Sequence, residues 1–182
     1  MRIVAGEYRT RVIKPVEGDG TRPTSDKIKE AIFSRIGPYF DGGTMLDLFG
    51  GSGNMGLEAI SRGIDHVYFS DDAMPAIQTI RANVKTLGVD KQCDIIRCDY
   101  MRMLETCANE QIRFDLIYLD PPYKKQQIAN ILMFIEEHAL LKEQGTIVCE
   151  SLKEDEFAET YGTLYKVKEK TYGITRISYY TR

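Results

Sequence analysis

Short apolar runs alternate with amphipathic segments through most of the chain. Runs typical of buried strands lie at 44–49, 66–70, 93–98, 114–119 and 145–150. The segments between them carry apolar residues at helical spacing. Strands that alternate with helices favour a parallel sheet joined by crossover helices. The pattern therefore predicts an α/β, Rossmann-like fold.

Helix signals support this interpretation. Thr24 or Ser25 can cap the first helix, with Asp26 in its first turn. The apolar stripe expected for this helix comprises Ile28, Ala31, Ile32 and Ile36. The pair Gly37-Pro38 ends the pattern. Further helices are expected over 57–63, 76–88 and 128–135.

The pattern changes near the C-terminus to alternation of apolar and polar residues. The alternation runs over 161–170 and 174–181, on either side of Tyr172-Gly173. Such alternation around a glycine turn is typical of an antiparallel hairpin. We therefore expect a hairpin that closes one edge of a mostly parallel sheet.

Composition adds limits to this picture. The chain has 182 residues, and its 43% hydrophobic content is ordinary for a globular protein. This length favours one domain, with a catalytic core over 24–182 and a short basic N-terminal arm over 1–23. No membrane span or signal peptide is recognisable, so the sequence predicts a cytoplasmic protein. The cysteines include no C-x-x-C pair, which argues against a metal site or disulfides.

Charge is distributed unevenly along the chain. Residues 1–35 have a balance of +3 and residues 36–182 a balance of −6. Contact with nucleic acid must therefore come from a local basic surface. The candidate RNA-binding residues of the arm are Arg2, Arg9, Arg11, Lys14 and Arg22. From the charge pattern alone, a hairpin whose charges are merely solvated is an equal alternative.

A glycine-rich segment follows the first predicted strand. Residues 51–56 satisfy the pattern G-x-G-x-x-G between a strand and a helix. Glycines in this position let a nucleotide lie against bare backbone at a helix N-terminus. Asp71 follows Gly51 by 20 residues, where a carboxylate can accept hydrogen bonds from ribose hydroxyls. The segment predicts a site for a nucleoside cofactor.

Aspartates stand at or near the ends of the first predicted strands, at Asp47, Asp71, Asp99 and Asp120. Parallel strands would bring these ends to one edge of the sheet, where open α/β folds bind ligands. Neighbouring carboxylates repel one another and a pyrophosphate, so they favour a cationic ligand without phosphate. S-adenosylmethionine is such a ligand, with an ammonium, a sulfonium and two ribose hydroxyls. For any single aspartate, a helix cap is the alternative interpretation.

The most specific motif is Asp120-Pro121-Pro122-Tyr123, directly after an apolar strand. The prolines stiffen the turn, so the Asp120 carboxylate and the Pro121 carbonyl can both face one substrate amine. Two acceptors on an exocyclic amine favour the pyramidal form that attacks a methyl group, and Asp120 could take the departing proton. Tyr123 could stack on the base. The alternative is an ordinary rigid turn.

The segment 46–53 and the Asp-Pro-Pro-Tyr turn resemble those of class I methyltransferases that act on exocyclic amines. More closely, Arg2 to Gly6, Thr21 to Thr24 and Tyr172-Gly173 resemble the bacterial 16S ribosomal RNA methyltransferases that modify N2 of guanine 966. The resemblance covers nearly the whole chain. It implies S-adenosylmethionine as cofactor, no metal, and 16S rRNA or a small-subunit assembly particle as partner.

The resemblance also implies roles for single residues. The family's catalytic tetrad corresponds to Asp120, Pro121, Pro122 and Tyr123. Its ribose-binding acid corresponds to Asp71 and its adenine-contacting acid to Asp99. Relatives often carry a further acid where this chain has Ala73, so Asp71 and Asp72 both remain candidates for the ribose. The cofactor-binding candidates are Asp47, Phe49, Gly50, Gly51, Ser52, Gly53, Asp71, Asp72, Asp99 and Tyr100.

Three other functions remain open from the residues themselves. A DNA adenine-N6 methyltransferase could use the same turn, but the chain leaves little room for a DNA-recognition module. A nicotinamide-dependent oxidoreductase is compatible with the glycine pattern but does not explain Asp-Pro-Pro-Tyr. An RNA-binding module with a vestigial cofactor pocket differs from our interpretation only in lacking activity.

Overall fold

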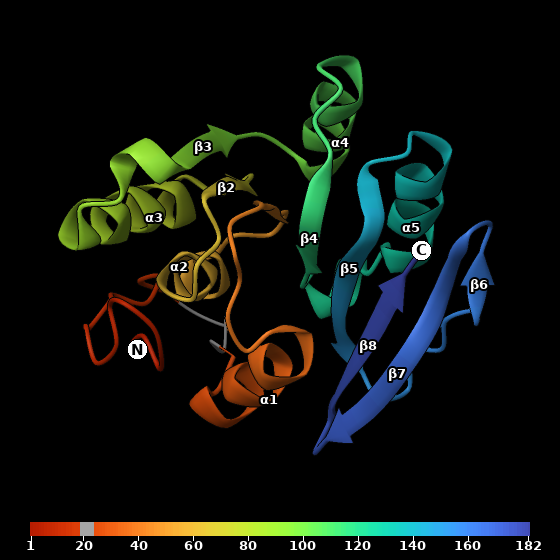
Figure 1. The fold of residues 1–182 in the computed structure, drawn as a ribbon, viewed down its shortest axis with the longest axis horizontal. Helices are drawn as coiled ribbons and strands as arrows, with labels where there is room; N and C mark the ends of the chain where they lie inside the picture. The colour runs from red at the N-terminus through yellow and green to blue at the C-terminus, as the bar shows by residue number, and fades with distance from the viewer. Residues whose placement is uncertain (19–23) are drawn as a thin grey trace. The chain divides into compact units, whose positions relative to one another are not determined.

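The computed structural model describes residues 1–18 and 24–182 (Figure 1). The chain divides into two compact units, Met1–Tyr100 and Met101–Arg182, which are described separately. The expectation of one domain with a distinct arm stays a prediction.

The first unit contains parallel strands with β2 between β1 and β3. The strands are β1 (Thr44–Asp47), β2 (His66–Asp71) and β3 (Cys93–Arg97). They confirm the strands predicted at 44–49, 66–70 and 93–98, with ends that differ by no more than two residues. Buried Met45, Leu46, Val67 and Phe69 show why these runs form strands inside the protein rather than on its surface.

Helices of the first unit cover these strands. They are α1 (Asp26–Ile36), α2 (Asn54–Ser61) and α3 (Met74–Leu87), followed by a short 3-10 helix, η1 (Asp90–Gln92). α2 packs against β1 and β2, and α3 packs against β2 and β3. Gly88 ends α3 with φ of 70°, and its N–H donates to the last carbonyls of the helix.

The first helix begins as predicted but buries a different face. The Ser25 hydroxyl accepts a hydrogen bond from the N–H of Ile28 at 3.2 Å, which confirms Ser25 as the cap. The predicted apolar stripe was partly wrong, because the buried residues of α1 are Lys29, Ile32 and Phe33. Lys29 turns inward because a buried carboxylate on α2 receives its ammonium.

The N-terminal residues form a small antiparallel hairpin, shown in red beside α2 in Figure 1. Arg2 bridges Val12, and the N–H of Ile3 donates to the carbonyl of Arg11 at 2.9 Å. Ile3 and Ile13 are buried, so the hairpin contributes to the core. We call residues 1–14 the N-terminal hairpin.

The second unit contains a mixed set of strands. They are β4 (Phe114–Leu119), β5 (Leu141–Leu152), β6 (Thr160–Tyr161), β7 (Leu164–Tyr172) and β8 (Thr175–Thr181). β4 and β5 are parallel, and β8 is antiparallel to β5 and to β7. The β7–β8 turn contains Gly173, whose φ of 60° suits glycine. The predicted C-terminal hairpin and the mostly parallel sheet are therefore confirmed.

Two elements of the second unit differ from the expectations. α4 (Tyr100–Asn109) is not predicted from the sequence, because only Met103, Leu104 and Cys107 form its buried face. β5 begins four residues before the predicted 145, because Leu141 pairs with Phe114 across a bulge although polar residues follow it. The remaining helices are α5 (Ile128–Glu137), as expected, and the 3-10 helix η2 (Tyr123–Lys125).

The cysteines are free thiols, with Cys107 and Cys149 buried. Within residues 1–18 and 24–182, no group of His, Cys, Asp or Glu side chains is arranged to hold a metal ion. No helix in the same residues is long and apolar enough to span a membrane.

Candidate active site

The glycine loop (residues 50–53) connects β1 to α2. Gly51 and Gly53 have φ of 57° and 84°, which side chains other than glycine rarely adopt. A Cβ atom on Gly51 would meet no atom within 4 Å, so its backbone borders open space. Gly53 caps α2, and its left-handed conformation allows the chain to enter the helix directly from the strand. The loop therefore presents bare backbone at a helix N-terminus, as the sequence predicts.

Two other glycines of the segment have a packing role instead. A Cβ atom on Gly56 would collide with the Phe69 ring of β2. A Cβ atom on Gly50 would lie 2.8 Å from Cδ1 of Ile80 on α3. These glycines let α2 and α3 approach β2 closely, which holds the loop in place.

Asp71, the last residue of β2, is bonded to the glycine loop. Its Oδ2 accepts the N–H of Gly51 at 3.0 Å, and its Oδ1 accepts the N–H of Ala73 at 3.0 Å. Burial raises the pKa of Asp71, and these backbone donors oppose the shift. Asp72 is exposed, so Asp71 is the aspartate of this pair that lies against the loop.

Asp47, the last residue of β1, is buried at 1% exposure. Its Oδ2 accepts the N–H of Gly56 at 3.2 Å, one turn into α2. Burial raises the pKa of Asp47 to about 8, although this hydrogen bond favours the ionised form. A cation beside this carboxylate would lower its pKa again.

The adenine-side candidates lie after β3. The prediction that Asp99 ends the third strand was wrong by two residues, because β3 ends at Arg97 and Asp99 directly precedes α4. Asp99 is exposed there. The rings of Phe49 and Tyr100 lie with centroids 5.6 Å apart at an angle of 39°. Both rings are half-buried, so they offer flat apolar surface beside the loop that follows β1.

Ser52 differs from its neighbours because its backbone is held from outside the loop. Its carbonyl accepts a hydrogen bond from the Asn83 side chain at 2.9 Å. Its hydroxyl lies 3.8 Å from the sulfur of Met1. Ser52 is buried, and its assignment to the cofactor stays a prediction.

The Asp-Pro-Pro-Tyr turn lies in the second unit, directly after β4. Asp120 is half-buried and Pro121 is buried. Pro122 has φ of −54° and ψ of 135°, and it leads into η2. Tyr123 is 45% exposed, so part of its side chain is accessible from solvent. The turn thus combines a half-buried carboxylate with a partly exposed ring.

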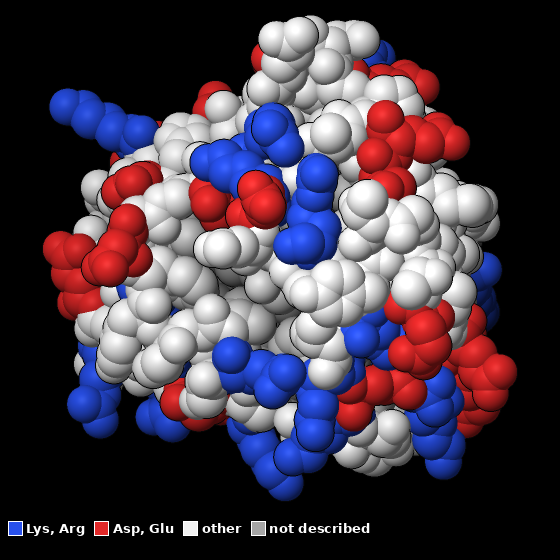
Figure 2. All heavy atoms as spheres, turned by 45° about the vertical axis from the view of Figure 1, so that its right-hand side comes forward, with Lys and Arg blue, Asp and Glu red and all other residues white. Residues whose placement is uncertain are grey.

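The basic residues of the arm are exposed but several are already engaged. Nε of Arg2 pairs with Asp26 at 3.0 Å, and Nη2 of Arg11 donates to the Thr86 carbonyl at 2.8 Å. Arg9 and Lys14 have exposed side chains, and Arg22 lies outside the described residues. On the face shown in Figure 2, basic and acidic side chains are interspersed. The RNA-binding role of these residues stays a prediction.

A buried ionic cluster that the sequence pattern does not predict is centred on Glu58 of α2. Glu58 pairs with Lys29 at 3.2 Å and with Arg62 at 2.9 Å, and all three side chains are at most 1% exposed. The Glu58 carboxylate also accepts the N–H groups of Val4 and Ala5 at 2.8 and 3.1 Å. Charges at helical spacing usually indicate a solvated face, so the sequence pattern carries no signal for this cluster.

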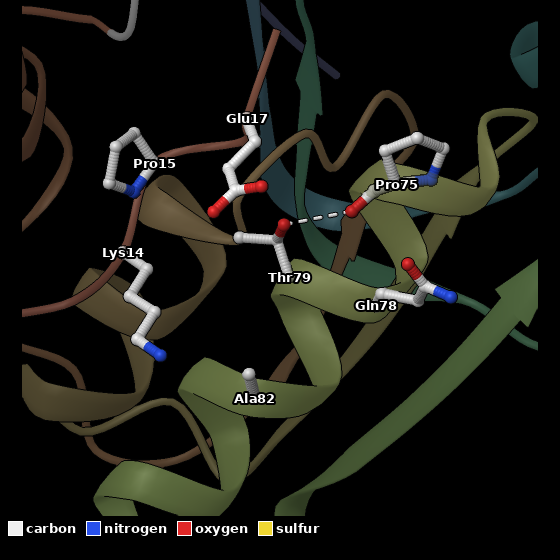
Figure 3. A pocket seen from close by; sticks show the side chains of 7 residues that line it. All are labelled: Lys14, Pro15, Glu17, Pro75, Gln78, Thr79 and Ala82. Carbon is white, nitrogen blue, oxygen red and sulfur yellow. Dashed lines mark hydrogen bonds between the residues drawn. The ribbon is translucent and has the colours of Figure 1, made fainter.

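A shallow pocket of about 220 Å³ lies between the end of the N-terminal hairpin and α3 (Figure 3). Its lining consists of Lys14, Pro15, Glu17, Pro75, Gln78, Thr79 and Ala82. The predicted glycine loop does not line it. The candidate cofactor residues therefore remain those at the glycine loop of the first unit, and the candidate substrate residues those at the turn of the second unit.

Comparison with known proteins decides the family. A family model described as "Conserved hypothetical protein 95" matches residues 1–181. The chain belongs to this family.

The chain is 46% identical to "Putative rRNA methyltransferase YlbH" of Bacillus subtilis, over 100% of this chain and 99% of that protein. It is 32% identical to "Ribosomal RNA small subunit methyltransferase D" of Haemophilus influenzae, over 99% and 93%. A solved structure of "Putative methyltransferase yhhF from Escherichia coli" superposes with a TM-score of 0.85 at 25% identity, over 100% and 97%. This chain therefore has a methyltransferase fold, as its sequence predicts.

Proposed function

We propose that this protein transfers a methyl group from S-adenosylmethionine to the exocyclic N2 amine of a guanine in 16S rRNA. The observation that carries the proposal is the Asp-Pro-Pro-Tyr turn after β4, with a half-buried carboxylate and an exposed ring. The names of the relatives support rRNA as the substrate class. Guanine 966 as the position follows from the family resemblance.

The residues of the first unit fit S-adenosylmethionine. Gly51 borders open space beside the Asp71 carboxylate, which suits a ribose whose hydroxyls need acceptors. Asp47 is a buried acid that gains from a nearby cation, which suits the charged methionine part. Phe49 and Tyr100 offer apolar ring surface for the adenine. When bound, S-adenosylmethionine supplies a methyl group on a positively charged sulfur.

Asp120 and the Pro121 carbonyl act on the substrate amine. The lone pair of an exocyclic amine is delocalised into the base, so the amine is a poor nucleophile. Hydrogen bonds from its N–H groups to these two oxygens favour the pyramidal nitrogen. Asp120 then accepts the proton that leaves as the new N–C bond forms. Pro122 has no N–H, so it supplies no donor that could compete with the substrate amine for the Pro121 carbonyl.

Tyr123 holds the target base after it has left the RNA duplex. A base inside a duplex cannot reach the turn, so it must be flipped out, which costs a few kcal/mol. Stacking on an aromatic ring contributes roughly 1–3 kcal/mol per base. The exposed Tyr123 ring can therefore offset much of this cost.

Two alanine variants test the assignment. Asp120→Ala should abolish methyl transfer and leave binding of S-adenosylhomocysteine nearly unchanged. Asp71→Ala should act mainly on that binding and weaken it by about 1–3 kcal/mol, because the acceptors for the ribose hydroxyls are lost. Calorimetric titration and transfer of a radioactive methyl group to 16S rRNA or assembly particles separate the two effects. Loss of cofactor binding in Asp120→Ala with an unchanged maximal rate would show the roles to be misassigned.

The alternatives give different products or ligands. Mapping of methylated nucleotides in rRNA from cells with and without this protein should show one missing N2-methylguanine. A missing N6-methyladenine in DNA would instead favour the DNA methyltransferase. Binding of NAD without binding of S-adenosylmethionine would favour the oxidoreductase, and rRNA binding without any methyl transfer would favour the binding module.

A further inference from the structure

Asn83 of α3 connects the N-terminal hairpin to the glycine loop. Its Oδ1 accepts the N–H of Lys14 at 2.8 Å, and its Nδ2 donates to the Lys14 carbonyl at 2.9 Å. The same Nδ2 donates to the Ser52 carbonyl at 2.9 Å. Asn83 is 1% exposed, so water cannot replace these bonds if one is lost. One buried amide thus holds the end of the hairpin and the middle of the loop.

Lys29 of α1 makes a second, separate connection. Its ammonium donates to the Arg2 carbonyl at 2.7 Å and to Oδ1 of Asn54 at 2.8 Å. Asn54 is the first residue of α2 and follows Gly53 directly. The hairpin is therefore bonded to the residues on both sides of Gly53, through Asn83 at Ser52 and through Lys29 at Asn54.

Asn83 and Lys29 connect packed helices to the N-terminal hairpin, which opens more easily than the helices do. α1, α2 and α3 are packed helices, whereas the hairpin contains no regular strand in the described structure: its backbone bonds, such as Thr10 N–H to the Ile3 carbonyl, flank an isolated bridge between Arg2 and Val12. Short hairpins open more easily than packed helices. A ligand that immobilises the glycine loop would therefore favour the docked hairpin, and a docked hairpin would favour the binding geometry of the loop.

We propose that docking of the N-terminal hairpin and cofactor binding at the glycine loop strengthen each other, with Asn83 as the positioning residue between them. The inference rests on the proposed function for the identity of the cofactor. The hairpin would then support cofactor binding through its backbone, independently of any contact between its basic side chains and RNA. RNA bound to those side chains would raise the affinity for the cofactor by the factor by which cofactor raises the affinity for RNA.

Hydrogen exchange and calorimetry on the full chain test the coupling. S-adenosylhomocysteine should slow exchange of the hairpin amides of Ile3, Thr10 and Ile13, which bond within the hairpin. In Asn83→Ala this slowing should be lost, and the dissociation constant of S-adenosylhomocysteine should rise about 5- to 10-fold. A residue with only a structural role would lower the melting temperature without removing the effect of the ligand on the hairpin.

A variant at the far anchor guards against misfolding of Asn83→Ala. The Ser61 hydroxyl on α2 donates to the Ala5 carbonyl at 2.6 Å and accepts the N–H of Tyr8 at 2.9 Å, away from the glycine loop. Ser61→Ala should speed hairpin exchange and also weaken S-adenosylhomocysteine binding. The matched control is Thr79→Ala, because the Thr79 hydroxyl bonds only the Pro75 carbonyl of its own helix in the described structure. This control should change neither quantity.

The outcomes separate the inference from the proposed function. Faster hairpin exchange in Ser61→Ala with wild-type affinity for S-adenosylhomocysteine would overturn the coupling. The same conclusion would follow from an Asn83→Ala protein that binds and responds as the wild type does. No binding of S-adenosylhomocysteine to the wild type would overturn the proposed function itself, and the coupling with it.

Discussion

Replacement of Glu58 by glutamine should destabilise the protein more than any substitution of a surface charge. The Glu58 carboxylate is completely buried and receives the side chains of Lys29 and Arg62. It also accepts the N–H groups of Val4 and Ala5, which fixes the N-terminal hairpin on α2. Glutamine keeps one acceptor oxygen but removes the negative charge, so two buried cations lose their shared partner.

The magnitude follows from burial. Removal of one partner from a buried ion pair costs about 3–5 kcal/mol, because the remaining charge is uncompensated. Arg62 retains Glu30 at 2.7 Å, whose side chain is 47% exposed, so Arg62 is only partly uncompensated. Burial already lowers the pKa of Lys29, and Glu58 opposes that shift, so Lys29 bears most of the loss. At about 2–4 °C per kcal/mol for this chain length, the melting temperature should fall by roughly 6–20 °C.

Differential scanning calorimetry and urea denaturation measure this change. The matched control is Asp26→Asn, which removes an exposed acid that bonds Arg2 of the hairpin. Arg2 and Asp26 form an ion pair with side chains 63% and 47% exposed, so this change should cost less than about 1 kcal/mol. A Glu58→Gln protein that melts within about 2 °C of the wild type would refute the argument from burial, because that shift corresponds to about 1 kcal/mol.

Other predictions concern pH, RNA and the second unit. Burial raises the pKa of Asp47 to about 8, whereas an aspartate of the unfolded chain releases its proton near pH 4. Between these values the folded state binds one proton more than the unfolded state, so the free energy of unfolding should fall from about pH 4 to pH 8. Asp47→Asn should flatten this fall in melting scans. Joint replacement of Arg9, Arg11 and Lys14 by alanine should weaken RNA binding and lower its salt slope by roughly 0.7 per lost phosphate contact. An unchanged slope in filter binding would exclude a role for these side chains. Tyr118→Phe should cost about 1–3 kcal/mol in urea denaturation, because the Tyr118 hydroxyl donates to a buried carboxylate on β5; a stability equal to that of the wild type would show this hydrogen bond to be replaceable.

The sequence by itself determined where the strands of the parallel part of the fold lie along the chain. Runs such as 114–119 are apolar apart from Asp115, and strands covered on both faces favour such runs. The capping residue Ser25 and the turn glycine Gly173 were also readable, because each satisfies a local requirement of the backbone. The Asp-Pro-Pro-Tyr turn and the glycine pattern were recognisable for the same reason, since their residues are contiguous.

Only the tertiary structure separated the roles of residues that look alike in sequence. Gly51 borders open space, whereas Gly56 meets the Phe69 ring from another element. Likewise, α4 forms on a narrow apolar face, and its burial depends on neighbours far away in the chain. Propensity and periodicity describe one segment at a time, so they cannot indicate which partner it meets.

The buried charges show the same limit most clearly. Glu58 and Lys29 are polar residues at positions where sequence patterns predict solvent, and their burial is possible only because each meets the other across two helices. Asn83 likewise becomes a connection only when the N-terminal hairpin folds back onto α3. A sequence specifies local geometry through contiguous residues, whereas the free energy of a buried polar group depends on partners that folding alone brings within hydrogen-bond distance.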